Sequence, residues 1–162
     1  MGPQGEEAFV GLGSNLGDRG AQLASAFAAL SVLPGTSLMA RSSFYESAPL
    51  DADGADYLNA VARLRTSLAP LELLHALQAI ESAAGRQRPY PNAPRCLDLD
   101  LLLYDDLAVE SDELVLPHPR LQQRAFVVVP LLEIAPGLRW RGGERLDSLL
   151  PALAGQRLAK LD

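Results

Sequence analysis

The segment 97–103 most constrains the fold of this chain, because acidic and apolar side chains alternate along it. Asp98 and Asp100 are separated and flanked by leucines. Successive side chains of a β-strand point to opposite faces, so the two carboxylates share one face and the leucines fill the other. The alternation predicts a strand over residues 97–104 that carries two acids about 7 Å apart.

Two carboxylates on one strand face repel each other and resist desolvation, so the arrangement is costly unless cations offset the charge. Magnesium suits such a pair, because it binds one or two carboxylates together with water and substrate phosphates. We therefore interpret Asp98 and Asp100 as candidate metal ligands. The alternative is a solvated strand face with two incidental acids, or with ion pairs to nearby arginines.

Arginines are concentrated around this strand. Lys160 is the only lysine among the 14 basic residues, and five arginines fall within residues 86–124. Arginine makes bidentate contacts with phosphate oxygens more readily than lysine. Residues 86–95 also contain three prolines, which predicts an extended, irregular loop that could act as a lid over a polyphosphate. The alternative is a solvated basic loop. The five arginines are Arg86, Arg88, Arg95, Arg120 and Arg124.

Composition limits the class of protein. An apolar share of 48% in 162 residues is enough for one core, and we expect a single domain over residues 1–162. A net charge of −6 argues against a general nucleic-acid binder. Cys96 is the only cysteine, which excludes an intrachain disulfide and suits a reducing cytoplasm. We expect no membrane span, because the chain lacks an apolar run of about 18 residues.

The remaining pattern predicts an α+β fold. Strands are expected at residues 9–13, 38–47, 57–66 and 97–104, and helices after Asp18, from Pro70 to Gly85 and at residues 120–126, just before an apolar run of three valines. The order β-α-β-β-α-β predicts a two-layer sandwich, with helices on one face of a mostly antiparallel sheet. The opposite face would then be free to carry a site.

Several further side chains are candidates for binding. Tyr57 and Asn59 share a strand face opposite leucines, so they could stack against a planar heterocycle and hydrogen-bond to it. His118 lies between two prolines and could donate to a phosphate or transfer a proton, or it could be structural. Phe126 offers another stacking surface or a core side chain. The glycine-rich segment 11–17 matches neither nucleotide-binding glycine motif, but it would let a ligand approach the backbone.

Taken in order, these segments resemble the 6-hydroxymethyl-7,8-dihydropterin pyrophosphokinase family of folate biosynthesis. The resemblance covers about residues 8–136, and the R-x-L-D-L-D motif at residues 95–100 is its most specific part. The matching segments are residues 11–17, 43–45, 49–50, 56–59, 85–86, 94–100, 117–119, 124–126 and 130–131. Two departures occur: Asn92-Ala93 stands where the family often has tryptophan and glycine, and Ala48 replaces a frequent proline.

The resemblance implies a ferredoxin-like fold, ATP as co-substrate, two magnesium ions and a monomer. Asp98 and Asp100 would hold both metals, and Arg86 and Arg95 would act with them in catalysis. The residues expected at the nucleotide are Gln78, Glu81, Arg86, Arg88, Arg95, His118 and Arg124. Those expected at the pterin are Gly11, Ser47, Ala48, Leu50, Tyr57, Asn59 and Phe126.

Two other classes of function compete with this interpretation. The first is another magnesium-dependent phosphoryl or nucleotidyl transferase, which would release ADP or free pyrophosphate rather than AMP. The second is a non-catalytic ferredoxin-like module that binds a ligand. A binding module has no need of two acids on one strand face beside an arginine-rich segment.

Overall fold

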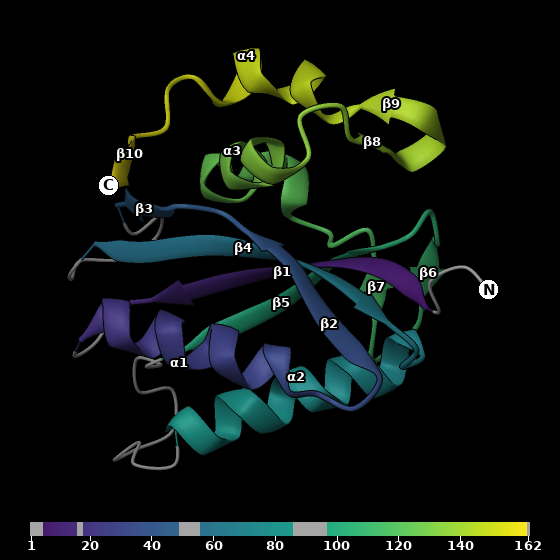
Figure 1. Ribbon diagram of the computed structural model, residues 1–162. Coiled ribbons are helices and arrows are strands. Elements are labelled where there is room, and N and C mark those ends of the chain that lie inside the picture. The colour runs from purple at the N-terminus through teal and green to yellow at the C-terminus, as the bar shows by residue number, and fades with distance from the viewer. Residues whose placement is uncertain (1–4, 16–17, 49–55, 86–96, 162) are drawn as a thin grey trace.

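The computed structural model describes residues 5–15, 18–48, 56–85 and 97–161, and Figure 1 shows how its helices and strands are layered. The strands are β1 (Glu6–Ser14), β2 (Thr36–Arg41), β3 (Phe44–Ser47), β4 (Tyr57–Thr66), β5 (Asp98–Tyr104), β6 (Val109–Glu110), β7 (Val115–Leu116), β8 (Arg139–Trp140), β9 (Glu144–Arg145) and β10 (Leu158–Leu161). The helices are α1 (Arg19–Ser31), α2 (Pro70–Gly85), α3 (Ala125–Ile134) and α4 (Leu150–Leu153), with 3-10 turns η1 (Leu121–Gln123), η2 (Arg141–Gly143) and η3 (Leu146–Leu149).

The main sheet is antiparallel at every pairing and has the order β10-β3-β4-β1-β5. β4 is long enough to pair with β2 along one half and with β3 along the other. β1 lies inside the sheet between β4 and β5. The expected strands at residues 57–66 and 97–104 are confirmed to within one residue, and so is the mostly antiparallel, ferredoxin-like arrangement.

Two helices, α1 and α2, cover one face of the sheet (Figure 1). Asp18 begins α1 as predicted, since its Oδ1 accepts a hydrogen bond from the Ala21 N–H at 3.0 Å. The apolar stripe of Leu23, Phe27 and Leu30 is buried against the sheet. Pro70 occupies the first position of α2, where its missing N–H costs nothing. Within the described ranges, no helix is long and apolar enough to cross a membrane.

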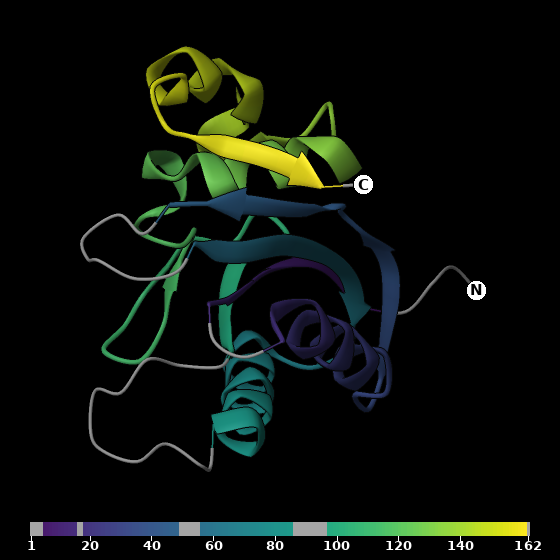
Figure 2. The same cartoon turned by 90° about the vertical axis from the view of Figure 1, so that its left-hand side faces the viewer.

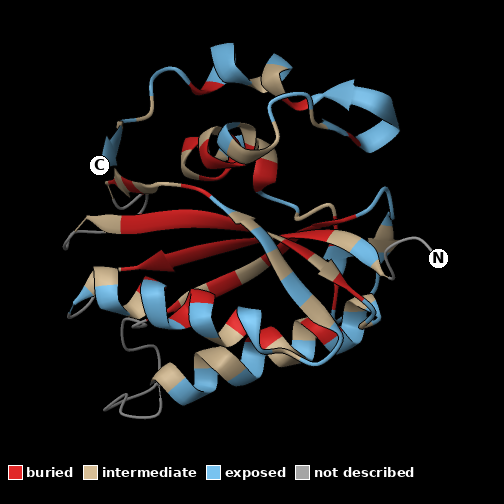
Figure 3. Cartoon of the chain, in the orientation of Figure 1, coloured by how far each residue is buried: buried red, intermediate tan, exposed pale blue. Residues whose placement is uncertain are grey.

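The opposite face of the sheet is covered in part, which differs from the expectation that helices lie on one face only. There α3 and the C-terminal segment form a third layer, visible above the sheet in Figures 1 and 2. Val61 and Leu102 of the sheet are buried in one cluster with Val128 and Leu131 of α3. The burial pattern in Figure 3 shows this second core. Among the described residues, α3 thus leaves the part of this face beyond it for a site.

The helix expected at residues 120–126 is wrong in its bounds. The chain forms the short turn η1 and then α3, which contains all three valines and Pro130. β-branched residues and an internal proline both disfavour a helix, and for that reason the sequence favoured an earlier end. Burial of Val127, Val128 and Leu131 against the sheet outweighs these local costs.

The packing of α3 on the sheet can be tested at Leu131, a residue of α3 that is fully buried. Leu131→Ala should lower the free energy of unfolding by about 2–5 kcal/mol, because it leaves a cavity between α3 and the sheet. Urea denaturation measures the change. Leu150→Ala is the control, since Leu150 is 39% exposed and should cost about 1 kcal/mol or less. Equal losses in the two variants would contradict the packing described for α3.

Candidate active site

β5 places the two predicted metal ligands on the sheet face that carries α3. Asp98 and Asp100 are partly exposed there, while Leu97, Leu99 and Leu101 are buried on the other face. The predicted alternation is therefore confirmed. Among the described residues, no group of three or more His, Cys, Asp or Glu side chains could hold a metal ion. A magnesium ion bound by this pair would complete its coordination with water and substrate oxygens, which is its usual preference.

Asp100 lies beside two further predicted residues. His118 Nε2 is 3.8 Å from Asp100 Oδ1, and Arg124 Nη1 is 3.8 Å from Asp100 Oδ2. These side chains come from three different segments: β5, the chain after β7, and the residue just before α3. The carboxylate remains 42% exposed, so these neighbours leave it open to a ligand.

The orientation of His118 is fixed by its backbone and by its ring. Its N–H donates to the Leu102 carbonyl at 2.9 Å, and its Nδ1 accepts from the Arg120 N–H at 3.2 Å. Burial lowers the pKa of His118, and the nearby Asp100 opposes that shift only in part. A neutral ring that accepts at Nδ1 carries its proton on Nε2, which faces Asp100. The ring can therefore donate a hydrogen bond at the open side of the carboxylate.

Two glycines of β1 form the floor between β4 and β5. Gly11 pairs with Asp100 on one side, and Gly13 pairs with Asp98 on one side and with Asn59 on the other. A Cβ atom at Gly13 would lie 3.4 Å from Asn59 Oδ1, and at Gly11 it would contact the Leu102 side chain at 3.5 Å. The absence of a side chain at Gly13 thus leaves space between Asn59 and the acidic strand.

Asn59 is held rigidly although it is polar and only 3% exposed. Its Nδ2 donates to Ser47 Oγ at 2.7 Å and to the Tyr45 carbonyl at 3.3 Å. Both amide hydrogens are therefore used, and Oδ1 is turned toward Gly13. A fixed carbonyl oxygen above a glycine floor is suited to accept hydrogen bonds from the edge of a heterocycle. The structure brings Ser47 and Asn59 together, as the predicted set requires.

Two aromatic side chains of the predicted set lie close to residues of this site: Tyr57 beside Gly13, and Phe126 beside Arg124. Burial raises the pKa of Tyr57, and the charge of Asp98 raises it further, which places the phenol within electrostatic range of the acidic strand. Phe126 lies in the first turn of α3, and the Arg124 guanidinium lies over its ring at 5.4 Å from the centroid. Arg124 therefore contacts both an aromatic ring and a carboxylate.

Glu81 of α2 contacts the acidic strand from its outer edge. Its Oε2 accepts from the Leu99 N–H at 2.7 Å, between the two aspartates. Gln78 is exposed one turn earlier on the same helix, and Ala48 is half-buried just after β3. The other predicted site residues lie outside the described residues, as does the Asn92-Ala93 departure. These are Leu50, Arg86, Arg88 and Arg95.

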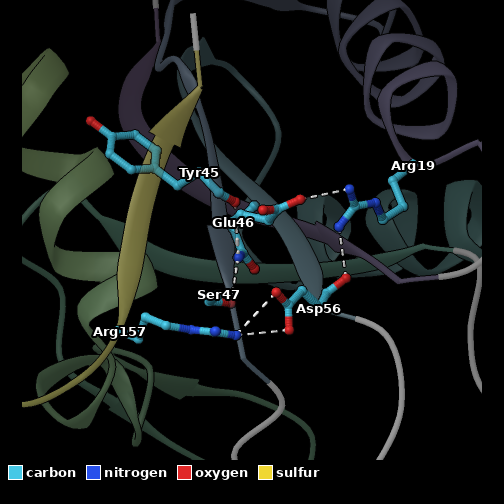
Figure 4. A network of polar contacts seen from close by, with 7 residues as sticks. Arg19, Tyr45, Glu46, Ser47, Asp56 and Arg157 are labelled. Carbon is cyan, nitrogen blue, oxygen red and sulfur yellow. Dashed lines mark hydrogen bonds and ion pairs between the residues drawn. The ribbon is translucent and has the colours of Figure 1, made fainter.

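A polar network that the sequence did not predict joins the end of β3 to the start of β4 (Figure 4). Arg19 donates to the Asp56 carbonyl and to Glu46 Oε2, each at 2.8 Å. Arg157 donates to both carboxylate oxygens of Asp56 at 3.0 Å. The partners are 27 to 101 residues apart in the chain, so no local spacing could have revealed them.

Comparison of the sequence with known protein families agrees with this geometry. Residues 9–136 match the model of the 7,8-dihydro-6-hydroxymethylpterin-pyrophosphokinase family. The chain belongs to this family. The matched range contains the two aspartates, the glycine floor, Asn59, His118 and Arg124.

Individual pyrophosphokinases are similar over nearly their whole length. The 2-amino-4-hydroxy-6-hydroxymethyldihydropteridine pyrophosphokinase of Haemophilus influenzae is 42% identical over 156 residues, which cover 96% of this chain and 98% of the relative. That of Pseudomonas aeruginosa is 44% identical over 157 residues, 96% of this chain and 97% of the relative. The predicted activity is thereby confirmed: the chain transfers pyrophosphate from its co-substrate ATP to 6-hydroxymethyl-7,8-dihydropterin, giving the pterin diphosphate and AMP in folate biosynthesis.

Solved structures support the fold. The wild-type Plasmodium falciparum HPPK-DHPS structure with pteroate has a TM-score of 0.72 and 12% sequence identity to this pyrophosphokinase. The match covers 94% of this chain and 43% of that chain, so this chain spans less than half of the longer protein. At this identity the likeness shows the fold alone.

The proximity of Tyr57 to Asp98 can be tested by titration. Asp98→Asn should lower the pKa of Tyr57, because it removes the nearby negative charge, while burial keeps the pKa above its ordinary value. The measurement is the phenolate absorbance of each protein minus that of its Tyr57→Phe counterpart. Asp106→Asn, on an exposed turn just after β5, is the control. An unchanged Tyr57 pKa in the Asp98 variant would contradict the arrangement.

Proposed function

We propose that pyrophosphate transfer takes place on the exposed part of the sheet face beside α3, between Asn59 and the Asp98–Asp100 pair. The observation that carries this proposal is the meeting of Asp100, His118 and Arg124 beside the glycine floor. One side of the floor presents hydrogen-bonding and aromatic groups, and the other presents carboxylates, a neutral histidine and an arginine. A reaction that joins a flat heterocycle to a polyphosphate needs these two surfaces side by side.

The pterin binds at the Asn59 side in this proposal. Asn59 Oδ1 accepts hydrogen bonds from the donor edge of the ring, and the Ser47 and Tyr45 contacts keep the amide in that orientation. Tyr57 and Phe126 supply aromatic surface on either side, and Gly11 and Gly13 allow close approach of the ring. Ala48 and Leu50 complete the pocket by family likeness.

The triphosphate of ATP lies at the other side. Arg124 and His118 donate to phosphate oxygens near Asp100, which matches the preference of arginine for bidentate phosphate contacts. Gln78 and Glu81 of α2 help to seat the nucleotide, with Glu81 held by the Leu99 N–H. Arg86, Arg88 and Arg95 add positive charge by family likeness, with Arg86 and Arg95 in catalytic roles.

Asp98 and Asp100 hold two magnesium ions in this proposal. The donor set fits: both are carboxylates, both lie on one face, and both are partly exposed, so water and phosphate oxygens can reach the same ions. Bound magnesium neutralises charge on the transferring group. The leucines on the opposite face of β5 anchor the strand and fix the direction of both carboxylates.

The reaction is an in-line displacement at the β-phosphorus of ATP. The pterin hydroxymethyl oxygen forms a bond to that phosphorus, the bond from it to the oxygen shared with the α-phosphate breaks, and AMP leaves as the pterin diphosphate forms. The proton of the attacking hydroxyl group is released to solvent water, and we assign no side chain as its base. Catalysis then depends on positioning and on charge stabilisation, as is usual for phosphoryl transfer. Asn59 and Arg124 align the two reactants from opposite sides of the floor.

We also propose that residues 1–162 act as one domain, as a monomer, in the cytoplasm. Both hydrophobic clusters pack on one sheet, which supports a single folding unit. The small-molecule substrates can be bound entirely by side chains of one chain. A single cysteine agrees with a reducing compartment.

The first test of the proposed site is Asp100→Ala. It should lower kcat by about a thousandfold or more, because it removes a group that stabilises charge at the reacting phosphorus. The melting temperature should change little, since the ion pairs it removes are long, at 3.8 Å, and Asp100 itself is 42% exposed. Asp106→Ala is the control. Chromatography of products should give AMP and pterin diphosphate from the wild type, and near-wild-type turnover in the Asp100 variant would refute the assignment.

The second test concerns the metal. A chelator should abolish activity and added magnesium should restore it. Asp98→Asn should raise the magnesium concentration needed for half-maximal rate by about tenfold or more, because the loss of one negative ligand weakens binding. An unchanged magnesium requirement in Asp98→Asn, with Asp106→Asn as reference, would count against Asp98 as a ligand.

A further inference from the structure

The backbone around Arg124 is held by a side chain from a distant part of the chain. Gln156 Oε1 accepts from the Ala125 N–H at 2.9 Å, and Gln156 Nε2 donates to the Gln123 carbonyl at 2.7 Å. The two backbone groups belong to the residues immediately before and after Arg124. One side-chain amide therefore hydrogen-bonds to the backbone on both sides of Arg124. Its two partners are 31 and 33 residues from Gln156 in the chain.

Gln156 supplies two kinds of hydrogen bond that the sequence next to Arg124 does not provide: a cap for the start of α3 and a partner for an extended residue. Arg124 is extended, with φ −125° and ψ 108°, and it precedes α3 where a helix usually has a capping Ser, Thr, Asp or Asn. An arginine has no acceptor, and its side chain makes no capping hydrogen bond. Gln156 supplies the acceptor for the first N–H of α3. Its two bonds also match those a neighbouring antiparallel strand would make to an extended residue.

Gln156 is itself anchored. Its N–H donates to the Leu153 carbonyl at 3.0 Å, and Leu153 is buried in the same cluster as Val128 and Leu131 of α3. The next residue, Arg157, contacts Asp56, and β10 then pairs with β3 so that Leu158 lies opposite Ser47. The amide is thus presented from a segment fixed at both ends, shown beside the sheet in Figure 2. This segment lies beyond the residues that match the family model.

The direction of the Arg124 side chain depends on this backbone. The Arg124 side chain is 19% exposed, and its guanidinium lies near Asp100 on one side and the Phe126 ring on the other. Rotation of the peptide before or after Arg124 would move the guanidinium away from Asp100 and would turn the first residue of α3 with it. Such misplacements at a reacting centre reduce the rate steeply, because the alignment of the groups is lost.

We propose that Gln156 is a positioning residue for pyrophosphate transfer, which acts by clamping the backbone on both sides of Arg124. The inference rests on the phosphate-binding role of Arg124 proposed above. Gln156 itself touches neither substrate. Its effect on the reaction passes through the guanidinium, and this distinguishes it from a residue that only stabilises the fold.

The test uses the full chain and four variants: Gln156→Ala, Gln156→Met, Arg124→Ala and the double variant Arg124→Ala/Gln156→Ala. Gln156→Met keeps the length and apolar stem of the side chain and removes both hydrogen bonds. Gln123→Ala is the matched control, because the Gln123 side chain is exposed in the same turn and the clamped carbonyl remains. Steady-state kinetics with ATP and the reduced pterin, and melting temperatures, are measured for each.

We expect Gln156→Ala and Gln156→Met to lower kcat/KM for ATP by about tenfold to a hundredfold, while Gln123→Ala stays within about twofold of wild type. In the Arg124→Ala background, loss of Gln156 should cost less than about twofold more, because the guanidinium it positions is already gone. A role in folding alone would give the same factor in both backgrounds, and that result would overturn the proposal. Wild-type kinetics in Gln156→Met would also overturn it.

The outcomes separate this inference from the proposed role of Arg124. Impaired Arg124→Ala with normal Gln156 variants leaves the phosphate-binding role intact and refutes the clamp. Wild-type kinetics in Arg124→Ala would refute the phosphate-binding role of Arg124. The proposed positioning role of Gln156 would then be refuted as well, because it acts through Arg124.

Discussion

The pairing register of β1 with its two neighbours is the constraint on which the site depends. It places Gly13 between Asn59 and Asp98, and Gly11 beside Asp100. If β5 shifted by one residue relative to β1, Asp98 and Asp100 would turn into the leucine core and the leucines would turn toward solvent. Such a shift would cost much apolar burial and would desolvate both carboxylates. Glycines weaken a strand, but β1 is hydrogen-bonded on both sides, which offsets that weakness. The space that Gly13 leaves beside the acids therefore lies on a strand that is hydrogen-bonded to both of its neighbours.

Much of the fold followed from the sequence because local pattern and tertiary structure agree. The alternation at residues 57–66 and 97–104, the Asp18 cap and the Pro70 start each depend on neighbours in the chain. One exception is the strand expected at residues 38–47, which the structure divides into β2 and β3. Another is α3, where three valines and Pro130 oppose a helix locally. Packing with Val61 and Leu102 of the sheet helps to stabilise it, and such long-range packing leaves no trace in a short window.

The candidate site was predictable to a similar extent. Two acids on one strand face follow from period two alone, and the aromatic and amide face of β4 follows likewise. The meeting of His118 and Arg124 with Asp100 needed the family resemblance, since three separate segments supply them. Gln156 could not have been found in either way. It acts through backbone groups, which every residue has, so neither spacing nor residue type indicates its partner.

The position of β10 affects the order in which the main sheet can form. β10 is an edge strand that pairs with β3 and follows the other strands of the sheet in the chain, so during synthesis β1, β4 and β5 can assemble before it emerges (Figure 2). Until then β3 presents unpaired N–H and C=O groups, which can pair with another chain. Gln156 arrives with the same segment. If Gln156 acts as proposed, a nascent chain that holds both aspartates, His118 and Arg124 but lacks β10 has an open edge at β3 and an unclamped Arg124, and it should transfer pyrophosphate more slowly than the chain with β10 paired.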